Sequence, residues 1–157
     1  MSFSTWRVRG SSSRRVGVIS LIEAVVKEAL KIITHPVVVS HTGTHGHCES
    51  PRNIHDELMQ DIAATGGVIG IGFWDAVCEY SPKGIASAIQ AAVELVGEDH
   101  VGLGSDFDGS VHTEMDASEY AAITHELLAL GMSEAIITKI MGGNILRVFS
   151  ERLPNNR

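Results

Sequence analysis

The sequence predicts a parallel α/β fold, in which buried strands alternate with amphipathic helices. Three apolar runs, over residues 36–40, 68–74 and 101–105, are each typical of a strand that is covered on both faces. Helical patterns precede the first run, separate the runs and follow the last one. Strands separated by helices of this length indicate parallel βαβ units.

The first helix is predicted over residues 21–33, where apolar side chains recur at intervals of three and four residues. We expect it to end before Pro36, because the residue that precedes a proline avoids the helical region. Asn53 is a good N-cap for the second helix, and glycines at residues 66–67 are expected to end it.

The third helix is predicted to begin with Ser81 as its N-cap and Pro82 as its first helical residue. Two further helices are predicted over about 116–130 and 133–141. The last of them is expected to stop at Gly142–Gly143, because glycine commonly follows the end of a helix.

The number of strands limits the possible architectures. Besides the three apolar runs, residues 16–19 are a candidate for a short additional strand. A closed eight-stranded barrel usually needs about 250 residues, whereas this chain has 157. The sequence therefore predicts either a small open sheet or part of a (β/α)₈ barrel.

We expect three regions along the chain: a basic, Ser- and Arg-rich leader (1–16), the α/β unit (17–150) and a polar tail (151–157). Residues 1–17 include four arginines and no acidic residue, which is typical of an organelle transit peptide and also of a disordered leader. We favour the disordered leader. No uncharged apolar run is long enough to span a membrane, so we expect a cytoplasmic location, with organelle targeting as the alternative.

Charge and cysteine content exclude several classes of protein. The 19 acidic residues outnumber the 12 basic ones, which argues against a nucleic acid as the main partner. The only cysteines are Cys48 and Cys78, so a disulfide framework and an all-cysteine zinc site are both excluded. A single bridge between these two cysteines stays open, although nothing in the sequence requires it.

Ligands of parallel α/β folds gather at the carboxyl ends of the strands, and three residues there are the candidates for function. His41 follows the first run, and imidazole suits zinc. Asp106 follows the third run, where a carboxylate can orient an amine or a water. Arg52 precedes the predicted helix start and can bind a carboxylate through two parallel hydrogen bonds; the alternative is a solvated arginine. For Asp108 we favour a tight turn.

Three more residues in the loop after His41 have side chains that can bind metals. We interpret His45, His47 and Cys48 as surface residues without a metal, because they lie in a glycine-interrupted loop and match no zinc-finger spacing. A mononuclear metal site in this loop is the least favoured alternative.

Several of these segments together resemble the renal or membrane dipeptidase family of zinc hydrolases. The likeness extends over about 17–150 and is strongest in 36–43, 51–53, 66–73, 100–109 and 141–149. Members of that family are (β/α)₈ barrels that bind two zinc ions and hydrolyse dipeptides. The resemblance therefore implies the carboxyl-terminal half of such a barrel, with three to four parallel strands and flanking helices.

The resemblance also implies a role for each candidate residue. His41 matches a histidine ligand of one zinc ion, and Arg52 matches the arginine that binds the free carboxylate of the dipeptide. Asp106 matches the aspartate that faces the amino end of the substrate and the metal-bound water, so it is the expected catalytic residue. Ser20 stands where the family has a second histidine ligand, and a hydroxyl is a poor zinc ligand. The other zinc ligands belong to the amino-terminal half of the family fold.

We therefore expect a zinc-dependent dipeptidase that attacks the peptide bond with a metal-bound hydroxide, and a chain that is weak or inactive alone. The expected partners are a dipeptide and either a second chain that supplies the missing half or further copies of this chain. The alternative is a non-catalytic relic or an interaction module that associates through its open half barrel, since unpaired strand edges and exposed apolar faces favour association.

Overall fold

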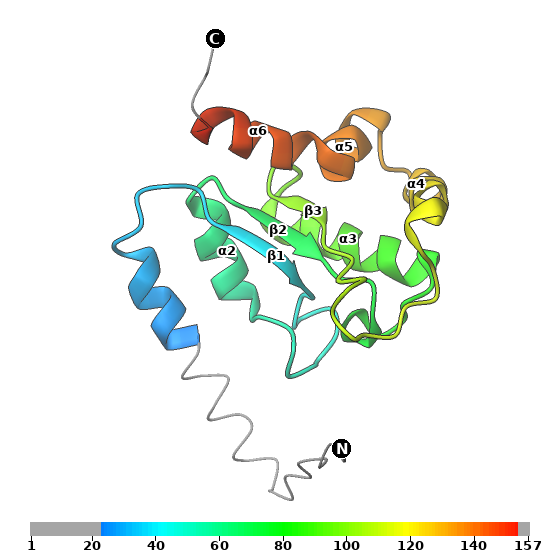
Figure 1. The fold of residues 1–157 in the computed structure, drawn as a ribbon, viewed down its shortest axis with the longest axis horizontal. Helices are drawn as coiled ribbons and strands as arrows, with labels where there is room; N and C mark the ends of the chain where they lie inside the picture. Colours follow the sequence, from blue (N-terminus) through cyan, green and yellow to red (C-terminus); the bar gives the residue numbers. More distant parts are fainter. Residues whose placement is uncertain (1–22, 154–157) are drawn as a thin grey trace, which may run out of the picture.

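The computed structural model describes residues 23–153. Its centre is a parallel sheet with the order β1-β2-β3, formed by β1 (Val38–Thr42), β2 (Val68–Ile71) and β3 (Val101–Leu103) (Figure 1). The predicted parallel α/β fold is thus confirmed. The expected leader, the candidate strand over residues 16–19 and Ser20 lie outside the described residues.

The first strand begins two residues later than the prediction for 36–40. Pro36 has no N–H to donate to a neighbouring strand, and the N–H of Val37 donates to Thr65 Oγ1 at 3.1 Å. Pairing with β2 therefore starts at Val38, which lies opposite Val68. The other two strands are shorter than predicted, although Gly104 still donates its N–H to the carbonyl oxygen of Ile71 at 2.9 Å.

Two helices cover one face of the sheet and form the core with it. α2 (Asp56–Ala64) and α3 (Pro82–Val96) both lie on this face (Figure 1). The side chains buried between the helices and the sheet are almost all aliphatic, and they include Leu58, Ile62, Ile69, Ile71, Ile85, Ile89 and Val101. This layer fixes the positions of the strand ends.

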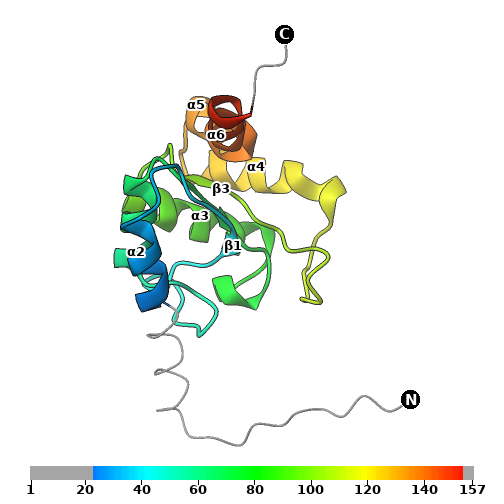
Figure 2. The ribbon, with the colours of Figure 1, turned by 60° about the vertical axis from the view of Figure 1, so that its left-hand side comes forward.

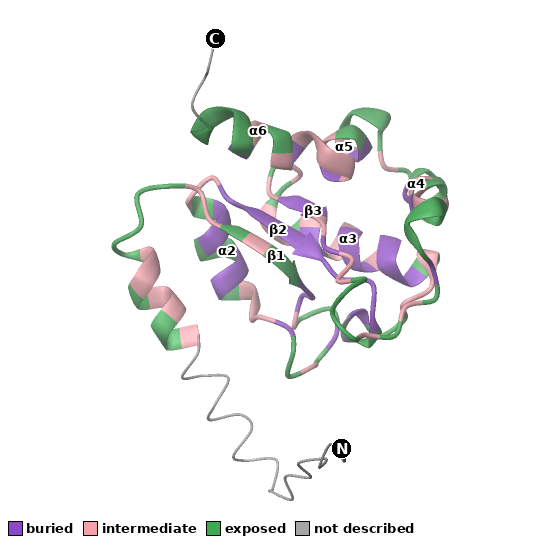
Figure 3. Cartoon of the chain, in the orientation of Figure 1, coloured by how far each residue is buried: buried purple, intermediate pink, exposed green. Residues whose placement is uncertain are grey.

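β1 is less buried than its sequence predicts. All four residues of β2 are buried, whereas Ser40 and His41 of β1 are exposed and Val38 is 40% exposed (Figure 3). β1 contacts chiefly β2, whereas β3, the other edge strand, also packs against α3 and the helical residues Lys139–Gly143 and is largely buried. The expectation that β1 is covered on both faces is therefore wrong for this edge strand.

The start of α2 also differs from the prediction. His55, rather than Asn53, is its N-cap residue. Asn53 is buried, and its Nδ2 donates to the carbonyl oxygen of Cys48 at 2.7 Å. The side chain expected to cap the helix instead ties together the loop that follows β1. The start of α3 agrees with the prediction, since Ser81 Oγ accepts the N–H of Gly84 at 3.2 Å.

The predicted helix over 116–130 consists of a 3₁₀ turn capped by Asp116, followed by α4 (Tyr120–Ala129). Its buried residues Ile123 and Leu127 join the core. None of the described helices is long and apolar enough to cross a membrane.

The helix predicted to stop at Gly142–Gly143 is interrupted there, but a further helix that was not predicted from the sequence follows directly. α5 (Glu134–Thr138) continues through a π-helical segment, Lys139–Gly143, into α6 (Asn144–Arg152), which lies beside β3 (Figure 2). Gly142 has a φ of 154°, which a side chain would disfavour, so the helix kinks there. Asn144 then anchors the new direction, because its buried Nδ2 donates to the carbonyl oxygens of Glu98 and Val101, both at 2.8 Å.

Replacing Asn144 should therefore destabilise the chain. The Asn144→Ala substitution leaves two carbonyl oxygens without their donor, which typically costs about 1–3 kcal/mol. We expect this loss in the free energy of unfolding measured with urea. The exposed Ser150 of α6 is the matched control, and its replacement by alanine should change that free energy by less than about 0.5 kcal/mol. Equal losses in the two variants would contradict the anchoring role.

Two side-chain contacts attach the helix at residues 23–30 to the start of α2. Glu23 Oε1 accepts from the backbone N–H of His55 at 2.9 Å and lies 2.7 Å from its Nδ1. Lys27 Nζ lies 3.2 Å from Glu57 Oε2. Burial by itself raises the pKa of Glu23, but the hydrogen bonds from His55 outweigh it and the pKa is lowered overall. A carboxylate whose pKa is lowered by folding stabilises the folded state while it is ionised.

We expect this attachment to weaken in acid. The stabilisation from Glu23 is complete above its ordinary pKa and is lost as the pH falls through the lowered value. Amide hydrogen exchange over residues 24–30 should then lose protection before the sheet does. The Glu23→Gln variant should show weaker protection with little dependence on acidic pH. A variant with the same acid dependence as the wild type would assign the effect to another group.

Candidate active site

The structure brings the three candidate residues together at the carboxyl end of the sheet. His41 lies in β1, Arg52 in the loop that follows it, and Asp106 three residues after the end of β3. Asp106 Oδ2 lies 3.8 Å from His41 Nε2 and 3.6 Å from Arg52 Nη2. Asp106 is therefore the centre of the cluster, between an imidazole and a guanidinium group.

The backbone around Asp106 fixes the position of its carboxylate. Asp106 has a φ of 57°, a left-handed conformation that aspartate tolerates better than most residues. Its carbonyl oxygen accepts the N–H of Gly109 at 2.9 Å, which closes a turn. A Cβ atom at Gly109 would overlap the carboxylate of Asp106, so any larger residue there would displace this carboxylate. Asp108 lies exposed in the turn, as its sequence context predicts.

A fourth residue of the cluster, Trp74, was missed by the sequence analysis. Its side chain is 1% exposed, and its ring lies 4.8 Å from Arg52 Cζ, a cation–π contact. The His41 ring meets the same indole edge to face, with 5.6 Å between ring centroids. The available signal was positional, because Trp74 ends the second apolar run, as His41 and Asp106 follow the other two.

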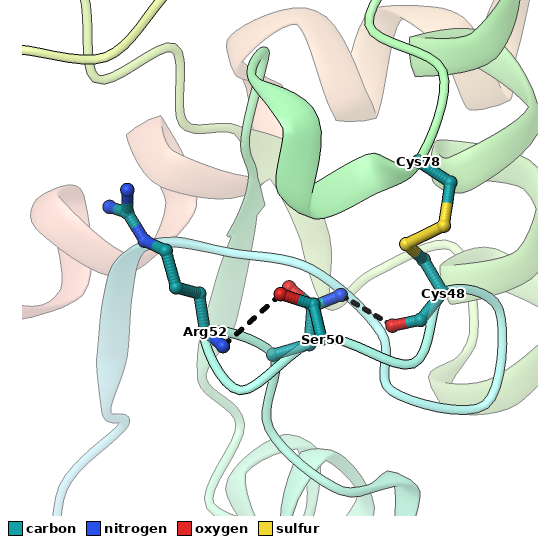
Figure 4. The surroundings of a disulfide bond; sticks show 5 residues. Cys48, Ser50, Arg52 and Cys78 are labelled. Atoms are coloured by element: carbon teal, nitrogen blue, oxygen red, sulfur yellow. Dashed lines mark hydrogen bonds between the residues drawn. A yellow bond between two sulfur atoms is a disulfide. The ribbon is translucent and has the colours of Figure 1, made fainter. Parts of the chain in front are cut away.

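A disulfide bond braces the loop that carries Arg52. Cys48, four residues before Arg52, is bridged to Cys78, which follows the 3₁₀ turn Asp75–Val77 after β2 (Figure 4). The bridge that the sequence left open is thus present. The Arg52 N–H also donates to Ser50 Oγ at 3.3 Å, and the guanidinium group points away from the bridge (Figure 4). The bridge joins the loop with Arg52 to the turn that follows Trp74.

The loop after β1 does not form a metal site of its own. Cys48 has no free thiol, and His45 stacks on His55 with 4.3 Å between ring centroids. Within residues 23–153, no group of three or more His, Cys, Asp or Glu side chains is arranged to hold a metal ion. The described residues therefore give no support to a mononuclear site at His41 to Cys48.

The described residues also offer too few donors for a catalytic zinc ion at the strand ends. Such a site uses three protein ligands and leaves one position open, whereas His41 and Asp106 are the only facing donors of this type in the cluster. The residues described here do not fit a complete zinc site. Any further ligands must come from outside the described part of the chain.

Comparison with known proteins places these observations in a family. Residues 16–156 match the model of the membrane dipeptidase family, peptidase family M19. The dipeptidase ataJ of Aspergillus terreus is 33% identical over 138 residues, which cover 82% of this chain and 34% of that protein. The dipeptidase verJ of Clonostachys rogersoniana is 36% identical over 132 residues, which cover 80% and 34% respectively. The chain thus spans about a third of the length of these relatives.

Solved structures show the same architecture. The probable dipeptidase PvdM from Pseudomonas aeruginosa is 25% identical with a TM-score of 0.73, over 80% of this chain and 47% of that one. A metallopeptidase from Rhodobacter sphaeroides, solved with a phosphinate mimic of the dipeptide L-Ala-D-Ala, is 20% identical. Its TM-score is 0.74 over 91% of this chain and 47% of that one, so it supports the fold alone. The chain folds like part of these TIM-barrel-type metallopeptidases.

The disulfide should stabilise both the fold and the loop with Arg52. We expect the Cys48→Ser/Cys78→Ser variant to lose about 2–4 kcal/mol in the free energy of unfolding, because the unfolded chain is no longer cross-linked. Urea unfolding with and without a thiol reductant checks this. The reductant should lower the stability of the wild type and leave the double variant unchanged. A wild type that is insensitive to complete reduction would contradict this role.

Proposed function

Because the chain belongs to the membrane dipeptidase family, a family of metallodipeptidases, we propose that it forms the substrate-binding side of a dipeptide-hydrolysing site. The observation that carries the proposal is the convergence of Arg52, Asp106 and His41 at the strand ends. These groups have complementary chemistry toward a zwitterionic dipeptide, which has one carboxylate and one ammonium group.

Arg52 binds the carboxylate of the dipeptide in this proposal. Its side chain is 49% exposed, so its N–H donors can be reached by a ligand. A guanidinium group presents a planar pair of donors that matches a carboxylate. The 3.6 Å separation from Asp106 Oδ2 is longer than a hydrogen bond, so that carboxylate does not occupy the donors fully.

Asp106 binds the ammonium group and is the proposed catalytic residue. Its side chain is only 11% exposed, and an ion pair in such a partly desolvated place is stronger than one in open water. A carboxylate at this position can also orient a water molecule toward the peptide carbon. Both tasks require an ionised carboxylate whose direction is fixed, as the turn at Gly109 provides.

His41 is the proposed metal ligand. Its Nδ1 lies 2.9 Å from Ser40 Oγ, which fixes the ring and leaves Nε2 on the side of Asp106. The zinc dependence and the hydroxide attack that the family resemblance implies belong to this proposal, but they need donors beyond residues 23–153. We therefore expect residues 1–157 alone to be weakly active or inactive.

Association with a further half of the fold remains part of the proposal. The outer edge of β1 is unpaired within the described sheet. An apolar hollow of about 200 Å³ on the sheet is lined by Val38, Leu103, Ile145 and Phe149, among others. These features support contact with a second chain or a second copy. Disulfides persist mainly in oxidising compartments, so the Cys48–Cys78 bridge argues against the expected cytoplasmic location.

The test is binding and hydrolysis of alanyl-D-alanine by the purified chain, with and without added zinc. We expect weak binding without turnover, and at least tenfold weaker binding by Arg52→Ala, because a charge-assisted bidentate contact is lost. The matched control is Arg152→Ala, which removes an exposed arginine at the end of α6. Equal binding by wild type and Arg52→Ala would overturn the proposed site. Rapid turnover with two bound zinc ions would overturn the claim that this chain lacks the metal donors.

A further inference from the structure

One buried ring supports two of the three residues of the proposed site. Trp74 is 1% exposed, yet its indole contacts the guanidinium group of Arg52 on one side and the ring of His41 on another. Asp106 Oδ2 lies 3.6 Å from Arg52 Nη2 and 3.8 Å from His41 Nε2, both beyond good hydrogen-bond distance. The indole is thus a second support of the Arg52 head group, beside the carboxylate of Asp106.

We infer that Trp74 is a positioning residue, whose indole holds the guanidinium group of Arg52 in the orientation that receives the substrate carboxylate. This inference rests on the proposed function. Trp74 does not bind the substrate itself, because its side chain is buried. It acts through Arg52, and through the edge of the His41 ring.

The chemistry of a ring contact suits this task better than a salt bridge would. A long, half-exposed arginine side chain loses rotamer freedom when it binds a ligand, and this lowers the affinity. A carboxylate partner would restrict the side chain but would also occupy its N–H donors. An aromatic face attracts the cation through its π electrons and uses none of these donors. Arg52 can therefore be held in place while its donors remain free for the dipeptide.

The indole is itself held by packing rather than by a hydrogen bond. A Cβ atom at Gly72 would overlap the ring, so only glycine leaves room for Trp74 in this orientation. The carbonyl oxygen of Trp74 accepts the N–H of Val77 at 3.0 Å, within the turn that the disulfide fastens. Its Nε1 is buried and has no acceptor within the part of the chain that the structure describes. The aromatic face, not the N–H, is thus the group that the site uses.

Because the aromatic face of Trp74 and not its N–H is used, phenylalanine should replace it with little loss, whereas leucine should not. Trp74→Phe keeps an aromatic face and removes the unsatisfied N–H, whereas Trp74→Leu keeps apolar bulk and removes the face. The matched control is Phe73→Leu at the neighbouring position. Phe73 is also fully buried, but its ring contacts Phe107 and Tyr120 instead of Arg52.

The experiment follows Arg52 by NMR in the full chain labelled with ¹⁵N-arginine, its side-chain Nε–H signal being assigned with Arg52→Lys. We expect an upfield ring-current shift that Trp74→Leu abolishes, that Trp74→Phe retains in part, and that Phe73→Leu leaves unchanged. The affinity for alanyl-D-alanine should fall about fivefold in Trp74→Leu and recover in Trp74→Phe. A merely structural role would instead affect Phe73→Leu and Trp74→Leu alike.

The outcomes separate this inference from the proposed function. If Trp74→Leu keeps the Arg52 signal and the dipeptide affinity while Arg52→Ala loses binding, the inference is overturned and the proposed function stands. If Arg52→Ala binds the dipeptide normally, the proposed function fails, and the substrate part of the inference fails with it.

A second measurement applies if Trp74→Leu does not fold. The chain has only two tryptophans, so in Trp6→Phe the single indole signal belongs to Trp74. Arg52→Ala in that background should shift the indole Nε1–H resonance and the fluorescence emission, whereas Arg152→Ala should shift neither. Unchanged indole signals in Arg52→Ala would overturn the inference.

Discussion

Parallel pairing of the three strands is the constraint on which the rest of the site depends. His41, Trp74 and Asp106 come from segments about 30 residues apart, and only parallel pairing delivers all three strand ends to one edge of the sheet. The pairing in turn requires α2 and α3, because each crossover must bury its apolar face on the sheet before the next strand can join. The core thereby determines the distances between groups that are far apart in the sequence.

Much of this fold could be predicted from the sequence, because apolar runs and helical spacing reflect burial directly. The departures occur where a distant partner decides the local structure. β1 begins later than predicted because the N–H of Val37 donates to the side chain of Thr65, which follows the next helix. A further helix, α6, begins directly after two glycines because Asn144 donates to carbonyl oxygens near β3. Such contacts depend on the tertiary structure, so no local sequence pattern predicts them.

Some residues of the candidate site could likewise be predicted from the sequence, and others could not. His41 and Asp106 could be predicted because they are polar residues that follow apolar runs, and Arg52 because it precedes a predicted helix start. Trp74 could not, because an apolar residue at the end of an apolar run looks like any core residue. The Cys48–Cys78 bridge was undecided for a related reason: the two cysteines lie in loops after different strands, and only the sheet brings their Cα atoms to 5.6 Å.

The charges of the cluster indicate which of its residues would bind the substrate and which would bind a metal in the proposed function. Arg52 and Asp106 form a nearly neutral pair, which can separate slightly to receive the two opposite charges of a dipeptide without leaving a net charge in the site. A metal would need further anionic or imidazole donors, and the described residues offer only His41 beside Asp106. In the proposed function, this part of the fold therefore contributes to substrate binding, while the metal site needs further donors. Asp106 is where the two tasks meet, because the same carboxylate oxygen faces both Arg52 and His41.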